Sequence, residues 1–95
     1  MMKIETHAGD RQLTLQVEGR LAGPFVPELE HCWHAASADR AAGTVLVDLK
    51  GVTCVDRAGR CLLQAMYRHG VKFVGARLAI QDVLDEVTAS QGSRR

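Results

Sequence analysis

The sequence lacks the features of a membrane protein or a nucleic-acid binder. Its uninterrupted apolar stretches are only a few residues long, far short of the ~20 residues that span a bilayer. Residues 1–5 do not open the apolar segment of a signal peptide. Twelve Lys and Arg against eleven Asp and Glu leave a formal net charge of +1, so the basic surface of a dedicated nucleic-acid binder is missing. These absences predict a cytoplasmic protein that neither enters a membrane nor binds nucleic acid.

Cysteine is scarce and shows no pairing pattern. Cys32, Cys54 and Cys61 are an odd number without a CxxC pair, which argues against a disulfide framework and against a zinc ribbon. We expect reduced, mostly buried thiols. His31 and His34 would share one face of a helix, but a structural zinc ion needs four ligands. Solvated histidines and no metal site are therefore expected.

Phosphate-binding loops are missing as well. Gly51 and Gly59 form neither a P-loop nor a GxGxxG motif, and the lysine–hydroxyl pair of a P-loop is absent. No internal repeat or low-complexity stretch interrupts the chain. We expect no cofactor.

The composition is that of one globular domain. The chain has 95 residues, of which 46% are hydrophobic and 24% charged. A chain of this length buries roughly two-thirds of its unfolded surface, enough to fold alone. We expect a single domain over residues 1–90, followed by a polar tail at 91–95.

The first part of the chain predicts a hairpin and a helix. Apolar and polar residues alternate from Lys3 to Val17 about Gly9-Asp10, as in a two-stranded hairpin with one buried face. Gly19 is expected to end the second strand. Beyond Gly23-Pro24, apolar residues recur with the period of a helix. These residues are Phe25, Leu29, Cys32, Trp33 and Ala36.

The middle of the chain predicts a buried strand and a capped helix. Thr44–Leu49 is a nearly continuous β-branched and aliphatic run, typical of a central parallel strand covered on both faces. Lys50-Gly51 predicts a turn, and Val52–Val55 an extended continuation. Asp56 stands where an N-cap carboxylate accepts N–H bonds from a second helix, which His69-Gly70 ends. The expected inner stripe of this helix is Ala58, Cys61, Leu62, Ala65, Met66 and His69.

The last part predicts a short strand at Val71–Val74 and a third helix. The apolar stripe of this helix is Ile80, Val83, Leu84 and Val87. The element order is therefore β-β-α-β-α-β-α. It predicts an α/β fold with a small mixed, largely parallel sheet, an N-terminal β-hairpin, right-handed crossovers and helices packed on the sheet.

An enzyme would need convergent titratable groups, and the sequence offers few. Asp48, Asp56, Cys54 and Cys61 lie near the C-terminal end of the central strand, where open α/β sheets present ligands. A cysteine nucleophile also needs a nearby base. His69 would lie roughly 15–20 Å from the helix start at ~1.5 Å per residue. We therefore expect no enzyme, with Cys54 and Cys61 as small buried side chains.

One segment, Val45–Leu63, resembles a known signature. An apolar strand leads into Asp48–Asp56, which reads Asp-Leu-x-Gly-Val-x-x-Val-Asp. Two further residues follow, and then Gly59 opens a helix. This pattern resembles the STAS domain, shared by anti-sigma-factor antagonists and the cytoplasmic tails of sulfate transporters. Upstream, Leu15–Leu21 looks like the family's strand that ends in Gly-x-Leu, so the resemblance covers almost the whole chain.

The resemblance implies a partner and a binding site. In the family, a kinase that is also an anti-sigma factor phosphorylates a Ser or Thr in this turn, and the unphosphorylated form binds that kinase. Carried over to this chain, the partner-binding residues are Asp56, Arg57, Ala58, Gly59 and Arg60. The phospho-acceptor position falls on Ala58, which has no hydroxyl.

Thr53 is the only nearby hydroxyl, and it precedes Asp56 by three residues in extended chain. It is a weak alternative acceptor.

The resemblance leaves several functions open. The first is a constitutively binding-competent member of a partner-switching pathway, which binds an anti-sigma factor or serine kinase without the Ser/Thr phosphoswitch. The second is a fixed STAS subunit of an ABC-type transporter or a multi-protein signalling scaffold. Some STAS domains are thought to hold nucleotides or lipophilic molecules, but no residue here singles out such a pocket.

The end of the chain predicts self-association. Many STAS domains continue with another strand and helix after the equivalent of Val83–Val87, whereas this chain stops at Arg95. An unpaired sheet edge or an apolar helix flank would then remain, and unpaired edges invite association. A homodimer is expected.

Overall fold

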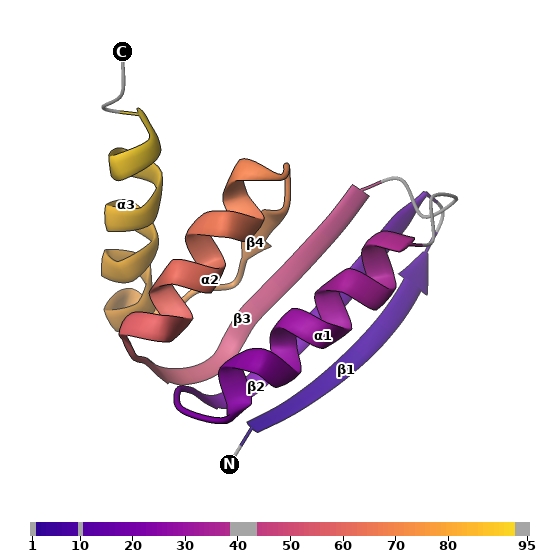
Figure 1. Cartoon of the computed structure of the whole chain (residues 1–95), viewed down its shortest axis with the longest axis horizontal. Coiled ribbons are helices and arrows are strands. Elements are labelled where there is room, and N and C mark those ends of the chain that lie inside the picture. The colour runs from indigo at the N-terminus through magenta and orange to yellow at the C-terminus, as the bar shows by residue number, and fades with distance from the viewer. Residues whose placement is uncertain (1, 10, 39–43, 93–95) are drawn as a thin grey trace.

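The computed structural model describes residues 2–9, 11–38 and 44–92. Along the chain it contains a hairpin and then alternating helices and strands, an α/β fold in the predicted order (Figure 1). The elements are β1 (Met2–Gly9), β2 (Gln12–Leu21), α1 (Phe25–Ala38), β3 (Thr44–Val55), α2 (Arg57–Arg68), β4 (Lys72–Val74) and α3 (Leu78–Gly92).

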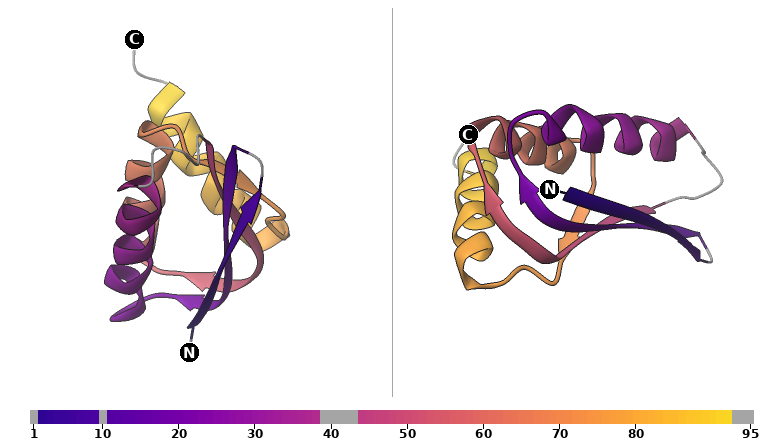
Figure 2. Two further views of the ribbon diagram at one scale, coloured as in Figure 1. Left: turned by 90° about the vertical axis from the view of Figure 1, so that its right-hand side faces the viewer. Right: turned by 90° about the horizontal axis from the view of Figure 1, so that it is seen from below.

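The four strands form one mixed sheet in the order β1-β2-β3-β4. β1 pairs antiparallel with β2, while β2 with β3 and β3 with β4 pair in parallel. Both parallel connections step in the same direction across the sheet, and right-handed crossovers that do so leave their helices on the same face. Figure 2 shows α1 and α2 together on one side of the sheet, with α3 beside the end where β3 enters α2.

Among the described elements, no helix covers the other face of the sheet, which corrects one expectation for Thr44–Leu49. Val47 and Leu49 are fully buried under the helices, but Leu46 and Asp48 on the opposite face are only half-buried. The continuous apolar run indicated that both faces are covered. Only one face is covered, because both crossovers run in the same direction and place α1 and α2 on the same side.

The core lies between the sheet and α1, α2 and α3. The alternation of β2 places Leu13, Leu15 and Val17 on this side, as predicted. The fully buried side chains are Leu15, Leu21, Leu29, Leu49, Leu63, Met66, Val17, Val47 and Val52.

Two expected breaks in the strands are absent from the structure. β2 does not end at Gly19 but continues to Leu21, with Gly19 at φ 97°. Lys50-Gly51 is not a turn either, because β3 runs on to Val55 and its pairing with β2 shifts register at this point. The backbone N–H of Lys50 donates to Oδ1 of Asp48 at 2.9 Å, and its carbonyl accepts from Nε of Arg77 at 3.1 Å. At the register shift, the backbone of Lys50 is thus hydrogen-bonded by the side chains of Asp48 and Arg77. The strand therefore forms a bulge here and does not turn.

The predicted helix faces are partly wrong. The residues of α2 that face the core are Gly59, Leu62, Leu63 and Met66. Ala58, Cys61 and His69 are instead exposed, so the helix is rotated from the predicted stripe. The cause is that Gly59 packs on β2, as shown below. The thiols are also less buried than expected, because Cys32 and Cys54 are half-buried and Cys61 is exposed.

The other two helices agree better with their patterns. In α1, Leu29, Trp33 and Ala36 are buried as predicted, but Val26 replaces Phe25 in the core. In α3 the whole predicted stripe packs inward: Ile80, Leu84 and Val87 are buried, and Val83 is half-buried. α3 continues to Gly92, into the residues 91–95 expected to form a tail, and 93–95 lie outside the described residues.

Candidate functional site

Asp56 caps α2, as predicted, and also anchors a second segment. It has an extended backbone (φ −88°, ψ −174°), and its Oδ1 accepts from the backbone N–H of Gly59 at 2.8 Å. Its Oδ2 accepts from the backbone N–H of Gly23 at 2.9 Å. Gly23 lies in the connection between β2 and α1, 33 residues earlier in the chain. One carboxylate therefore fixes both the start of α2 and the loop beside it.

The backbone of Asp56 is fixed as well. Its N–H donates to the carbonyl of Leu21 at 3.2 Å, and its own carbonyl accepts from the N–H of Arg60 at 2.9 Å. The N–H groups of Gly23 and then of Gly59 lower the pKa of the Asp56 carboxyl below its ordinary value of 3.8, because they bond to the charged form. Asp56 is thus ionised at neutral pH and placed at the positive end of the α2 dipole.

Gly59 is buried at the point where α2 meets β2. A Cβ at this position would lie 2.6 Å from the carbonyl oxygen of Leu21 and 2.9 Å from Cγ1 of Val55. Only glycine fits without a shift of backbone. The Gly59 position therefore brings the first turn of α2 onto the end of β2 and sets the rotation of the helix.

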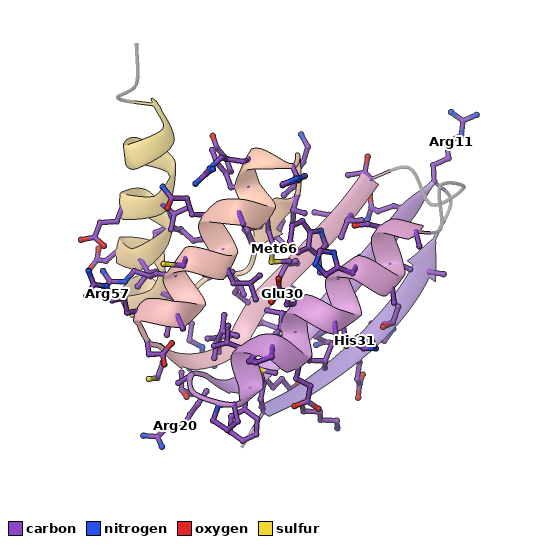
Figure 3. All side chains as sticks on the ribbon, in the orientation of Figure 1. Arg11, Arg20, Glu30, His31, Arg57 and Met66 are labelled. Atoms are coloured by element: carbon purple, nitrogen blue, oxygen red, sulfur yellow. The ribbon has the colours of Figure 1, made fainter. Side chains whose placement is uncertain are left out.

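The side chains between and directly after these two anchors face solvent. Arg57, Ala58 and Arg60 are exposed, and Cys61 beside them is exposed too. Figure 3 shows Arg57 pointing outward at the start of α2, at the same end of the molecule as Arg20. Of the five residues predicted to contact a partner, Asp56 and Gly59 thus hold the turn, and the other three are presented on it.

A groove between α2 and α3 adjoins the turn. Its volume is about 470 Å³, and it is lined by Arg57, Arg60, Cys61, Gln64, Glu86 and Val87. Nη1 of Arg60 lies 2.6 Å from Oε1 of Glu86 and forms an ion pair with it across the groove. Sequence reasoning missed Glu86 and Gly23. No local pattern marks them, because each meets the turn only through the tertiary fold.

The remaining nucleophile candidates do not converge with a base. The hydroxyl of Thr53 is exposed and donates to the carbonyl oxygen of Gly19 at 3.2 Å. Cys54 is half-buried near the end of β3. His69 is the C-cap of α2, at the far end of that helix, and its Nδ1 contacts the carbonyl of Ala65 at 2.8 Å. Cys54 and His69 thus lie at opposite ends of α2.

One of the two histidines of α1, His34, contacts neighbours on its own helix. Nε2 of His34 lies 3.6 Å from Oε2 of Glu30, and the His34 ring stacks on Trp33 at a centroid distance of 4.9 Å. His31 is exposed. Among the described residues, no group of three or more His, Cys, Asp or Glu side chains is placed to hold a metal ion. Within the same residues, no helix has the length and apolar character needed to cross a membrane.

Comparison with solved structures relates this fold to known proteins. An anti-sigma factor antagonist from Mycobacterium paratuberculosis superimposes with a TM-score of 0.80 at 21% sequence identity, over 98% of this chain and 82% of that one. The anti-sigma factor antagonist SpoIIAA in its unphosphorylated form gives a TM-score of 0.68 at 15% identity, over 99% and 98% of the two chains.

The chain has the fold of the anti-sigma-factor antagonists. A further example of this STAS fold, the antisigma-factor antagonist STAS domain from Rhodobacter sphaeroides, gives a TM-score of 0.57 at 23% identity. That match covers 78% of this chain and 86% of the other. No protein-family model and no curated protein matches the sequence. The STAS fold is therefore shown by structure, at sequence identities below 25% in these comparisons.

Replacing Gly59 with alanine tests the close contact with β2. In most helices this change is stabilising, by about 1 kcal/mol of helix propensity. Here the added methyl group meets the carbonyl of Leu21 and the side chain of Val55. We expect a net loss of about 1–3 kcal/mol in the free energy of unfolding, the usual cost of overpacking. Urea denaturation followed by circular dichroism measures it.

Gly9→Ala is the matched control, because its added Cβ would lie 3.6 Å from the carbonyl oxygen of Gln12, an ordinary contact. A Gly59→Ala variant as stable as Gly9→Ala would contradict the assignment of the contact.

Replacing Asp56 with asparagine tests the double anchor. The asparagine oxygen can accept only one of the two backbone N–H groups, so the variant should be less stable than the wild type at neutral pH. A carboxyl with a lowered folded pKa contributes stability that is fully present above its unfolded pKa. The advantage of the wild type should therefore shrink as the pH falls below 3.8 and vanish below the lowered folded pKa.

Thermal unfolding at pH 7 and in acid compares the two proteins. Asp82→Asn, which removes an exposed carboxylate from α3, controls for the change in net charge. A pH-independent difference between the wild type and Asp56→Asn would rule out the carboxylate as the source.

Proposed function

We propose that this chain is a cytoplasmic, non-enzymatic protein-interaction module of the anti-sigma-factor antagonist type. It binds a regulatory partner, an anti-sigma factor or serine kinase, through the Asp56–Gly59 turn and the helix α2 that follows. The observation that carries the proposal is the pair of hydrogen bonds from Gly59 and Gly23 to Asp56. They support a preorganised surface, because the turn is already held in one conformation before a partner arrives.

The exposed side chains of the turn supply the contacts. Arg57 is exposed, and arginine is enriched at the energetic centres of protein interfaces. Arg60 is already held by Glu86 at 2.6 Å, so less side-chain entropy is lost when a partner fixes it. The small Ala58 between them allows a partner to approach the helix backbone closely.

The proposed module has no phosphoswitch. A phosphate on this turn would add about two negative charges beside the ionised Asp56, which would repel them at a packed interface. Ala58 has no oxygen to accept that phosphate. The hydroxyl of Thr53 is already bonded to the carbonyl of Gly19, and Thr53 lies in β3, outside the turn. The binding-competent state is therefore permanent.

Affinity capture from native lysate tests the proposal. The wild type should retrieve an ATP-binding anti-sigma kinase, and an Arg57→Glu, Ala58→Glu double variant should lose it by at least about tenfold, the scale of one interface hot spot. Acidic residues at the start of a helix favour the helix, so this variant should stay folded. The matched control is Arg11→Glu, Gln12→Glu, which makes the same charge change at the hairpin, at the opposite end of the molecule (Figure 3).

The alternative outcome is equally specific. Retrieval of transporter or scaffold subunits in place of a kinase would make the chain a fixed STAS subunit and overturn the proposed pathway. Equal retrieval by the wild type and the double variant would remove the Asp56–Gly59 turn from the interface.

Restoring a hydroxyl tests the missing switch. The Ala58→Ser variant should become a substrate of the captured kinase, and the phosphorylated variant should release it, whereas the wild type should remain unmodified. Mass spectrometry with peptide mapping measures the phosphorylation, and the affinity capture described above measures the release. Phosphorylation of wild-type Thr53 that abolishes binding would contradict the permanent state.

A further inference from the structure

β1 is one edge of the sheet, and its outer side pairs with no strand of the described residues. It has 8 residues, whereas β4 at the other edge has only 3. An edge strand of this length exposes a row of backbone N–H and C=O groups that another strand can pair with. β1 also contains no proline, and its pairing with β2 runs from Met2 to Gly9 without a bulge. Two common devices that block edge pairing are thus missing.

The charges of β1 alternate in a way that suits a second copy of the same strand. Lys3 and Glu5 lie on the uncovered face of the sheet, with side chains 66% and 45% exposed, and their charged groups are 3.3 Å apart. On the opposite face, Met2 and Ile4 are half-buried and pack against the core. The strand therefore has one charged face and one apolar face, and both run up to the open edge.

We propose that two copies of this chain pair antiparallel through β1 and form a two-fold symmetric dimer with one continuous sheet. The dimer axis lies at Ile4. Lys3 of each copy then stands opposite Glu5 of the other, and the two Ile4 side chains face each other on the helix side. The occupant of the edge is a second copy of this chain, selected by charge complementarity.

The alternative registers are worse. An axis at Glu5 would place two glutamates directly opposite each other, which is destabilising. An axis at Thr6 would bring Glu5 opposite His7, but it would leave Lys3 opposite Gly9 and the half-buried Ile4 opposite the exposed Ala8. Only the axis at Ile4 pairs Lys3 with Glu5 on one face and the two Ile4 side chains on the other.

The dimer leaves the α2 turn open. In Figure 1, β1 lies on the far side of the molecule from α2 and α3, so pairing through β1 places the two turns at opposite ends of the dimer. The assembly does not depend on the proposed function. If that function holds, the dimer is bivalent and gains avidity for a dimeric or clustered partner.

Sedimentation equilibrium from micromolar to millimolar concentration tests the dimer and its register. The wild type should dimerise with increasing concentration. Lys3→Glu should weaken the dimer by about tenfold, because two-fold symmetry turns both attractive pairs into repulsive ones. The charge swap Lys3→Glu, Glu5→Lys should restore it. Lys72→Glu, the same change on the opposite sheet edge, should leave it unaltered.

These side chains are exposed, so the variants should fold, and circular dichroism verifies this. A wild type that stays monomeric at millimolar concentration overturns the proposal. So does a charge swap that fails to restore the dimer, or a Lys72→Glu variant as weak as Lys3→Glu. Kinase capture by a monomeric wild type would reject the dimer and leave the proposed function intact.

Discussion

The carboxylate of Asp56 connects parts of the chain that no secondary-structure element joins. The carboxylate accepts one hydrogen bond from the first turn of α2 and one from the β2–α1 connection. The backbone N–H of Asp56 donates to the end of β2. These bonds hold the ends of two neighbouring parallel strands and the starts of two helices at one corner of the sheet. The direct approach of Gly59 to Leu21 depends on the same alignment. The exposed surface of the turn at the start of α2 has a defined shape because these hydrogen bonds fix the backbone beneath it.

The uneven coverage of the sheet follows from topology. Both crossovers leave their helices on one face, so the opposite face keeps polar residues such as Gln16 and the half-buried Asp48. Asp48 gains a structural role from this position, since it bonds the backbone of Lys50 where β3 bulges. Asp48, which the sequence placed near the end of the central strand, lies within β3 and bonds the backbone of its own strand.

Local patterns predicted what depends on local physics. The element order, the buried alternation of β2, the cap at Asp56 and the stripe of α3 all follow from periodicities and turn residues that a single segment contains. The errors arise where distant segments meet. The rotation of α2 is set by Leu21 pressing on Gly59, and the continuity of β3 past Gly51 is set by its register with Glu18. In sequence, a glycine usually indicates the end of a helix or strand. Only the fold shows that Gly51 and Gly59 are instead places where two segments pack too closely for a side chain.

The same distinction explains why the sequence predicts the turn but not the distant residues that contact it. Asp56 and Gly59 carry the geometry of the turn, and their spacing is visible in sequence. Glu86 and Gly23 complete it from distant positions.

Ala58 is exposed, and its methyl group takes no part in the hydrogen bonds that hold the turn. A serine, threonine or alanine there would leave the turn equally well formed. Under the proposed function, binding and switching are therefore separable, because packing constrains the anchors Asp56 and Gly59 but not the exposed side chain at position 58. On this proposal, an alanine at position 58 removes the switch at no structural cost and leaves the shape of the turn unchanged.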